Sequence, residues 1–403
     1  MKGLQDVEYL PEPTDRSIVS AVDPTVIGFQ DEWRSEIMGW APLPVEPVVV
    51  RPRRSRSLGG LVAFAFLISL SLILWQNQWV VVELSMPQSE WAFEETGIRG
   101  LQDDGLTGEG VRVCMVDTGI DLTHEAFDGK EVVFKDFIGG SATPLDYGAV
   151  AHGTLMAGLL NANAHQQGAA PNVTLAMAAA LQDNGEGENT GFDDDVADAI
   201  RWCQFDFKAD IISLSLGGTE RSGENDEGSS SSATRQATDA GIFVVAAAGN
   251  DGQNDDGDVA SPGSVRLAIS VGATTQLGTI WENSSVGSPQ DEQGTVRQSP
   301  HQKPEVVAPG NRIISTGSEN LWYSSSGTSD STVFVTGALS LILEAYPSLK
   351  PSDSSGSTCI ELVKQALADS ARSPLEVSHD VEWGYGALDA EAWFCALGQN
   401  SGC

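Results

Sequence analysis

Basic residues are scarce in this chain of 403 residues. It contains 22 lysines and arginines, only seven of them lysines, against 56 aspartates and glutamates, so its formal net charge is −34. A field of this sign repels phosphate, and we therefore expect no nucleic-acid partner. The acidic, lysine-poor composition allows two interpretations. The protein works in a salt-rich exterior, where ions screen the repulsion between its carboxylates, or the acidic surface only keeps the protein soluble.

Cysteine is also rare. With five cysteines, at least one must stay free or pair between chains. Cys114 and Cys203 lie in the apolar patterns of a predicted strand and a predicted helix, so we expect two small buried core residues. Near the C-terminus we expect one disulfide among Cys359, Cys395 and Cys403, which would fit an oxidising exterior.

Apolar residues, by contrast, make up 41% of the chain. Together with 43 glycines they indicate a globular protein, because a disordered chain lacks the residues needed to bury a core. Single cores stop growing near about 250 to 300 residues. The length therefore predicts one large domain of catalytic size with appendages, and it excludes a lone peptide or coiled coil.

One appendage is a long uncharged run. Residues 58–82 contain no charge and, as a helix, could cross a hydrocarbon layer about 30 Å thick. Arginines precede the run at Arg51, Arg53, Arg54 and Arg56. The positive-inside rule then makes residues 1–57 a disordered cytoplasmic tail with a basic juxtamembrane segment, and six of the 18 prolines lie in residues 1–50. We expect an uncleaved transmembrane signal-anchor helix; a cleaved signal peptide is the weaker alternative, since no small-residue cleavage site follows.

After the uncharged run, short apolar segments alternate with helical patterns. Predicted strands cover 111–119, 173–181, 210–218, 241–250 and 267–273, and a helix is predicted at 192–205. This order is typical of an α/β fold with a mostly parallel sheet and helices on both faces. In such sheets ligands bind beyond the carboxyl ends of the strands, where Asp117, Ser215 and Asn250 lie.

Three short motifs each contain one candidate catalytic residue. VCMVDTGID contains Asp117, AHGTLMAG contains His152, and SSSGTSDSTVFVTG contains Ser329. Each alone could be structural, as a turn former, a satisfied histidine or a helix N-cap. Together they predict nucleophilic acyl transfer, which needs a hydroxyl, an imidazole base and a carboxylate that orients the imidazole.

These motifs, in the order Asp, His, Ser, resemble those of the subtilisin-like serine proteases, the subtilases. The landmarks SLSLGG, AAAGN, KPEVVAPG and GYGALDA follow in the family's order, and the resemblance covers residues from about 90 to 395. It implies a three-layer subtilisin-like fold at 93–398, after a linker at 83–92 and before a tail at 399–403.

The resemblance also implies roles for individual residues. Ser329 would be the nucleophile, His152 the general base and then acid, and Asp117 the orienting carboxylate. The side chain of Asn250 and the backbone N–H of Ser329 would bind the oxyanion. The residues implied to line the substrate pocket are Ser215, Leu216, Gly217, Ala247, Ala248 and Gly249. We expect this pocket to accept sizeable apolar side chains.

The sequence departs from the family beside the nucleophile, where Asp330 and Val333 stand in place of the usual Met and Pro. A carboxylate there would raise the pKa of His152. Ala126 replaces a calcium-binding Asp. We therefore expect no required cofactor and assign no metal ligands, although a structural calcium site elsewhere stays open, for example in the acidic loops 220–232 and 251–258.

Taken together, the sequence predicts a serine endopeptidase anchored in the cell membrane by one helix. Its N-terminus would be cytoplasmic, and its catalytic domain would cleave extracytoplasmic polypeptides. One alternative is a catalytically inactive subtilase fold that serves as a binding or scaffold module on the cell surface. Another is a soluble secreted protease.

Overall fold

The computed structural model describes residues 64–69, 88–218, 228–252, 258–291, 293–352 and 356–398. The chain divides into two units, residues 1–84 and 85–403. In the first unit only 64–69 are described, as a short helix with exposed side chains. No helix among the described residues is long and apolar enough to cross a membrane. Most of the predicted anchor 58–82, and the predicted tails 1–57 and 399–403, lie outside the described residues.

The second unit is built on a sheet of seven strands in the order β2-β3-β1-β6-β7-β8-β9. Every pairing within it is parallel, which confirms the predicted α/β class. The strands are β1 (Arg112–Asp117), β2 (Val132–Asp136), β3 (Thr174–Ala179), β6 (Ile211–Leu214), β7 (Phe243–Ala247), β8 (Ile269–Thr274) and β9 (Val306–Pro309). Parallel pairing brings the carboxyl ends of these strands to one edge.

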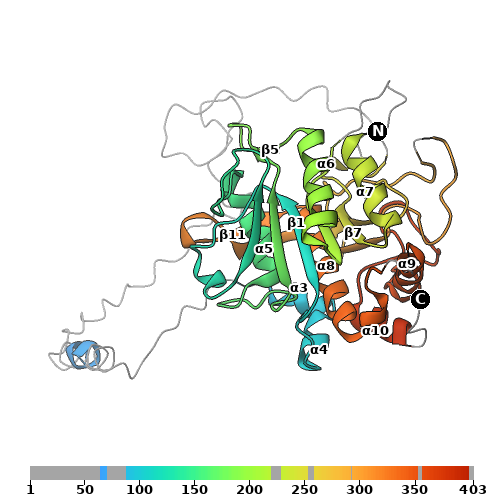
Figure 1. Cartoon of the computed structure of the whole chain (residues 1–403). Helices are drawn as coiled ribbons and strands as arrows, with labels where there is room; N and C mark the ends of the chain where they lie inside the picture. Colours follow the sequence, from blue (N-terminus) through green and yellow to red (C-terminus); the bar gives the residue numbers. More distant parts are fainter. Residues whose placement is uncertain are drawn as a thin grey trace, which may run out of the picture. The chain divides into compact units, whose positions relative to one another are not determined.

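Helices cover both faces of this sheet. On one face, α5 (His152–Asn161) and α8 (Thr328–Ala345) share a core with Val113 and Met115 of β1. On the other, α6 (Asp193–Trp202) and α7 (Ser229–Asp239), which lie side by side in Figure 1, pack on Cys114 and Val116. Successive strand residues point to opposite faces, so β1 serves both cores. The predicted helix at 192–205 is α6, continued by a π-helical turn, Cys203–Phe207.

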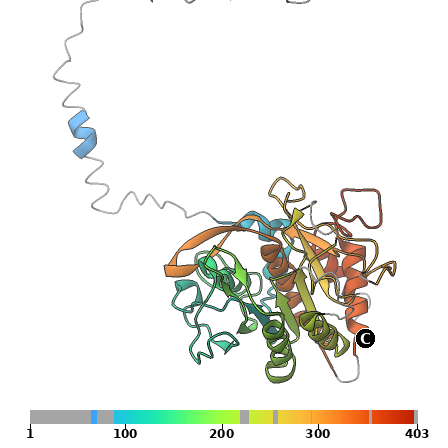
Figure 2. The same ribbon diagram turned by 90° about the horizontal axis from the view of Figure 1, so that it is seen from above.

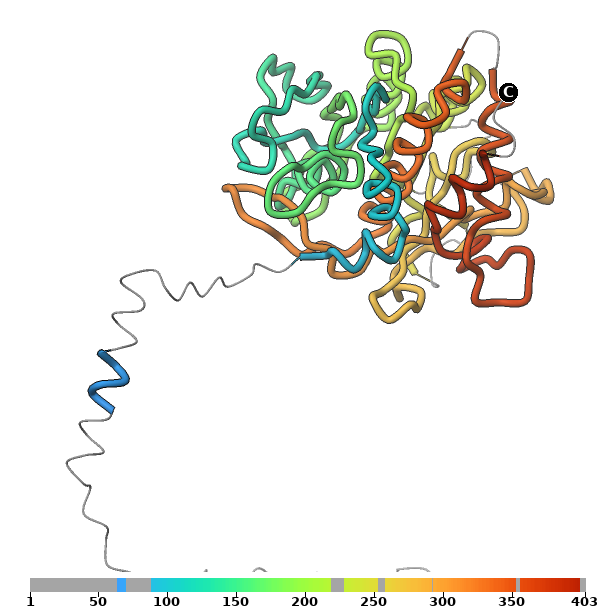
Figure 3. The backbone as a smooth tube through the Cα atoms, turned by 90° about the horizontal axis from the view of Figure 1, so that it is seen from below, coloured from blue at the N-terminus to red at the C-terminus, as the bar shows by residue number. Residues whose placement is uncertain are grey.

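The two ends of the second unit meet on the α8 face. The N-terminal helices α3 (Glu90–Glu95) and α4 (Ile98–Asp103) share a core with the C-terminal helices α9 (Thr358–Ser370) and α10 (Ala390–Gly398). Figures 1 and 3 show α4 next to α10. Phe93 packs edge-on against Phe334 of α8, with ring centroids 4.9 Å apart. Ser89 and Ala92, in the segment expected to be a linker, are therefore buried within the fold.

Short elements complete the unit. The hairpins are β4 (Gln182–Asp183) with β5 (Asn189–Thr190), and β10 (Asn311–Thr316) with β11 (Trp322–Ser326), the orange arm of Figure 2. Single turns of 3-10 helix are η1 (Glu125–Phe127), η2 (Ala149–Ala151), η5 (Ser318–Asn320) and η6 (Pro347–Leu349).

The disulfides correct one expectation from the sequence. Cys114 and Cys203, predicted to be separate core residues, are joined by a disulfide with a Cα–Cα distance of 5.8 Å. Both are fully buried, as expected, but they meet because the face of β1 that carries Cys114 packs under the end of α6. Cys359 is also disulfide-bonded, whereas Cys395 is free and exposed.

Candidate functional site

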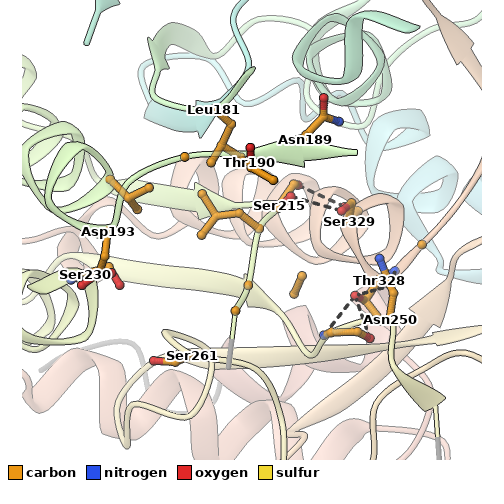
Figure 4. Close-up of a pocket in the computed structure, with 18 of the residues that line it drawn as sticks. Leu181, Asn189, Thr190, Asp193, Ser215, Ser230, Asn250, Ser261, Thr328 and Ser329 are labelled. Atoms are coloured by element: carbon orange, nitrogen blue, oxygen red, sulfur yellow. Dashed lines mark hydrogen bonds between the residues drawn. The ribbon is translucent and has the colours of Figure 1, made fainter. Parts of the chain in front are cut away.

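A cleft of about 960 Å³ lies beyond the carboxyl ends of β6 and β7. Its walls come from residues at or just after the ends of these strands, 215–218, Ala247 and 249–251, and from the first residues of α5, α6, α7 and α8. Figure 4 shows side chains from several of these elements facing the same space. The cleft lies where the α/β topology predicts a ligand site.

Asp117 and His152 form a hydrogen-bonded pair at this edge. Asp117 is the last residue of β1 and is only 1% exposed. Its Oδ1 accepts a hydrogen bond from His152 Nδ1 at 2.7 Å and another from the N–H of Thr118 at 2.7 Å. Burial lowers the pKa of His152, but the Asp117 carboxylate, with smaller effects from Asp330 and Asp146, raises it to about 9.

The first turn of α5 is tied directly to the end of β1. Asp146 accepts hydrogen bonds from Thr118 Oγ1 at 2.6 Å and from the backbone and hydroxyl of Thr154 at 2.8 and 2.7 Å. Thr118 Oγ1 in turn accepts from the N–H of Gly153 at 2.8 Å. This network fixes the geometry of the Asp117–His152 pair. The sequence does not indicate Asp146 as a site residue, because its partners lie up to 28 residues away.

Ser329 lies at the second position of α8 and faces the cleft with His152. Its Oγ donates to the carbonyl of Ser215 at 3.2 Å, and Ser215 Oγ donates back to the carbonyl of Ser329 at 3.2 Å (Figure 4). No hydrogen bond joins His152 to Ser329 among the described residues. The nucleophile candidate and the base candidate thus share the cleft without a hydrogen bond between them.

Two hydrogen-bond donors converge next to Ser329. Asn250 Oδ1 accepts from the N–H of Thr328 at 2.9 Å and from its hydroxyl at 3.0 Å (Figure 4), which leaves the Nδ2 group as the free donor. A Cβ built on Gly327 would lie 3.5 Å from Asn250 Nδ2 and 3.6 Å from Ser329 N. The two N–H groups therefore flank one small space, which suits a developing negative charge. The orienting role of Thr328 was not predicted.

Five of the six predicted pocket residues line the cleft. They are Ser215, Leu216, Gly217, Ala247 and Gly249. Ala248 does not line it, because this residue is fully buried and its backbone bonds to Val271 and Ala260.

Another wall of the cleft is not indicated by the sequence. It is formed by Leu181, the β5 end and the start of α6, where Asp193 and Asp194 also lie. Both aspartates lie in the first turn of α6, where their negative charge favours the helix dipole. They also bind the start of α7, accepting from the N–H and the hydroxyl of Ser229, each at 2.6 Å.

The residues that depart from the family pattern fit the fold. Asp330, 1% exposed, accepts a hydrogen bond from Ser325 Oγ of β11, and Val333 is buried inside α8. Ala126 is buried in η1. Within the described residues no group of three or more histidines, cysteines, aspartates or glutamates could hold a metal ion.

Comparison with known proteins agrees with this architecture. The model of the subtilase family matches residues 108–386. The chain belongs to the subtilase family. Over 277 residues it is 35% identical to an extracellular serine proteinase of a Thermus species, covering 65% of this chain and 58% of that protein. It is 31% identical over 300 residues to subtilisin DY of Bacillus licheniformis, covering 72% and 93% of the two chains.

Two further relatives define the extent of the match. The chain is 31% identical over 313 residues to the serine protease AprX of Bacillus subtilis, covering 71% of this subtilase and 66% of AprX. The match therefore spans less than two thirds of the Thermus proteinase and of AprX. A solved structure, the prenylagaramide maturation protease PagA, has the same fold, with a TM-score of 0.57, 22% identity, and coverage of 75% and 98%.

Proposed function

We propose that this subtilase is a serine endopeptidase that hydrolyses peptide bonds of polypeptides through an acyl-enzyme on Ser329. The observation that carries the proposal is the 2.7 Å hydrogen bond between His152 Nδ1 and Asp117, in a cleft that also holds Ser329 and Asn250. A nucleophile, a base with its orienting carboxylate and two oxyanion donors are the groups that acyl transfer requires.

In this mechanism Ser329 Oγ leaves the carbonyl of Ser215 and turns toward His152 Nε2, which takes its proton. Catalytic hydrogen bonds are often absent before substrate binds. The Oγ attacks the carbonyl carbon of the peptide, and the resulting oxyanion accepts hydrogen bonds from Asn250 Nδ2 and the N–H of Ser329. His152 then protonates the leaving amine, and water hydrolyses the acyl-enzyme by the reverse sequence.

The cleft supports a preference for extended polypeptides. A substrate strand would pair with residues 215–217, whose side chains line the cleft next to the small residues Ala247 and Gly249. These small side chains leave room for a sizeable apolar residue of the substrate before the cleaved bond.

We further propose that residues 58–82 anchor the enzyme in the cell membrane with the catalytic unit outside. The uncharged run and the arginines before it support the orientation, and the Cys114–Cys203 disulfide supports an oxidising compartment. Labelling of intact cells with a membrane-impermeant amine reagent tests this proposal. Modification of the catalytic unit only after lysis would contradict it.

The catalytic proposal is tested by fluorophosphonate labelling of the full-length chain beside Ser329→Ala, with a peptide library as substrate. We expect labelling and cleavage by the wild type and neither by the variant, because only an activated serine forms the phosphonyl adduct. A folded wild-type protein that neither reacts nor cleaves at any pH would instead favour the inactive binding or scaffold module.

A further inference from the structure

Asp330 is a buried carboxylate that the triad mechanism does not use. It follows Ser329 directly in the first turn of α8, is 1% exposed and lines the same cleft as His152. Its Oδ1 accepts a hydrogen bond from Ser325 Oγ, across from β11. Buried carboxylates are costly unless a partner stabilises their charge, so this position requires an explanation.

The charges around Asp330 point to His152 as that partner. The carboxylates that act on His152 come from three elements: Asp117 from β1, Asp330 from α8 and Asp146 from the loop before η2. No lysine or arginine occurs among the described residues that line the cleft. Burial raises the pKa of Asp330 to about 7, whereas the Ser325 hydrogen bond and the charge of His152 act in the opposite direction.

We propose that Asp330 is a positioning residue for His152: a second buried carboxylate that stabilises the imidazolium form, with Ser325 holding that carboxylate ionised. The inference rests on the proposed protease function, and it adds a group that the Asp–His–Ser set does not contain. No bond to Asp330 forms or breaks in the reaction. It acts through the charge of the imidazole ring alone.

The proposal has two opposite consequences for rate. In the free enzyme, His152 must be neutral to accept the Ser329 proton, so a raised pKa places the acid limb of kcat/KM near pH 9. In the transition state the ring becomes charged, and the nearby carboxylate then favours the reaction. Loss of the Asp330 charge should therefore raise activity between about pH 7 and pH 9, where Asp330 is ionised and His152 still titrates, and lower it on the alkaline plateau.

The experiment measures kcat/KM against pH, from 6 to 11, for the full-length enzyme, Asp330→Asn and Ser325→Ala. An opposite charge nearby shifts a pKa by about 1 to 3 units. We expect the acid limb of D330N to move toward lower pH by about one unit at most, since Asp330 acts on His152 less strongly than Asp117 does, with the plateau reduced. S325A should move the limb in the same direction by less, because Asp330 becomes easier to protonate without its donor.

Ser324→Ala is the matched control, since Ser324 is an exposed neighbour in β11 that faces away from this contact. Its profile should match the wild type. An unchanged acid limb in both D330N and S325A, with activity retained, would overturn the inference. If D330N does not fold, the pH profile of S325A and an NMR titration of the His152 ring test the inference in its place. Absence of labelling in the wild type would instead refute the protease proposal itself.

Discussion

Single residues on either side of Ser329 set the geometry in which an oxyanion would bind. Asn250 presents its Nδ2 because Thr328, not Ser329, holds its Oδ1. Gly327 leaves open the space between this Nδ2 and the N–H of Ser329. These contacts explain why three consecutive residues, 327–329, each have a separate function in the proposed chemistry.

Gly327→Ala tests this arrangement. The φ of Gly327 is 175°, an extended conformation that alanine adopts, and the added Cβ would make only ordinary van der Waals contacts. We expect the melting temperature to change little but kcat to fall by about 10²- to 10³-fold, the loss known for one oxyanion donor in subtilisin relatives.

Steady-state kinetics with thermal unfolding measures both quantities. Gly218→Ala is the control, because its Cβ would meet nothing within 4 Å although it lies in the same cleft. An unchanged kcat in the Gly327 variant would show that no oxyanion occupies this space.

At the residue scale, the sequence indicates a candidate residue where a short motif contains it, and its catalytic role stays a prediction. The strings around Asp117, His152 and Ser329 are short, and the structure brings all three to one edge of the sheet. Contacts between distant segments were not predictable. Thr328 and Asn250 lie 78 residues apart in sequence, and the burial of Ala248 depends on strand pairing that its own motif does not indicate.

At the scale of elements, a buried ion cluster joins β9 to its neighbours. Glu305 Oε1 binds Lys303 Nζ at 2.9 Å and Lys364 Nζ of α9 at 2.6 Å, and all three side chains are at most 1% exposed. Both lysines also donate to the carbonyl of Ala268, just before β8. Burial lowers the pKa of Lys303 to about 7 even though Glu305 favours its charged form.

Glu305→Gln should therefore destabilise the fold strongly. Removal of one partner from a buried ion pair costs about 3 to 5 kcal/mol, because the remaining charge is left uncompensated. Equilibrium urea unfolding measures the loss. Asp198→Asn serves as comparison, since the Asp198–Arg201 pair is exposed and such pairs contribute about 0 to 1 kcal/mol. Equal losses in the two variants would argue against a structural role for the cluster.

Helices and strands were predictable from the sequence where their apolar pattern is long and regular. The five long apolar runs became β1, β3, β6, β7 and β8. The edge strand β2 was missed because its residues alternate between half-buried and exposed positions, and β9 because its short apolar run lies between Pro304 and Pro309, and proline is uncommon in strands. The disulfide was missed since 89 residues separate its two cysteines.

At the scale of the whole second unit, its first residues hold a distant loop in place. Gln88 Nε2 donates to the carbonyl of His165 at 2.7 Å, and Gln102 Nε2 donates to that of Gly168 at 2.8 Å. Arg99 binds the carbonyl of Gln167 at 2.9 Å. The side chains of residues 88–102 thus satisfy backbone groups of the loop before β3. Of these residues only Gln88 lies in the predicted linker 83–92, and its contact with His165 joins that end of the linker to the fold.

Net charge also acts on the whole molecule. Residues 58–403 carry a net charge of −32, so folding brings many carboxylates together and their repulsion opposes the compact state. Added salt should relieve this repulsion, since the Debye length falls from about 10 Å at 0.1 M to about 3 Å at 1 M. We therefore expect the melting temperature to rise with NaCl and most of the rise to occur below about 0.5 M, where screening changes most steeply.

The way the melting temperature depends on NaCl concentration distinguishes charge screening from the general stabilisation caused by excluded solutes. An excluded solute such as sucrose stabilises folded proteins in proportion to its concentration, without saturation. Thermal unfolding at matched osmolality of NaCl and sucrose therefore decides between the two. A saturating rise in NaCl alone would indicate that the acidic surface is adapted to an ion-rich exterior. A melting temperature independent of NaCl would mean that the carboxylates are spaced widely enough to serve solubility only.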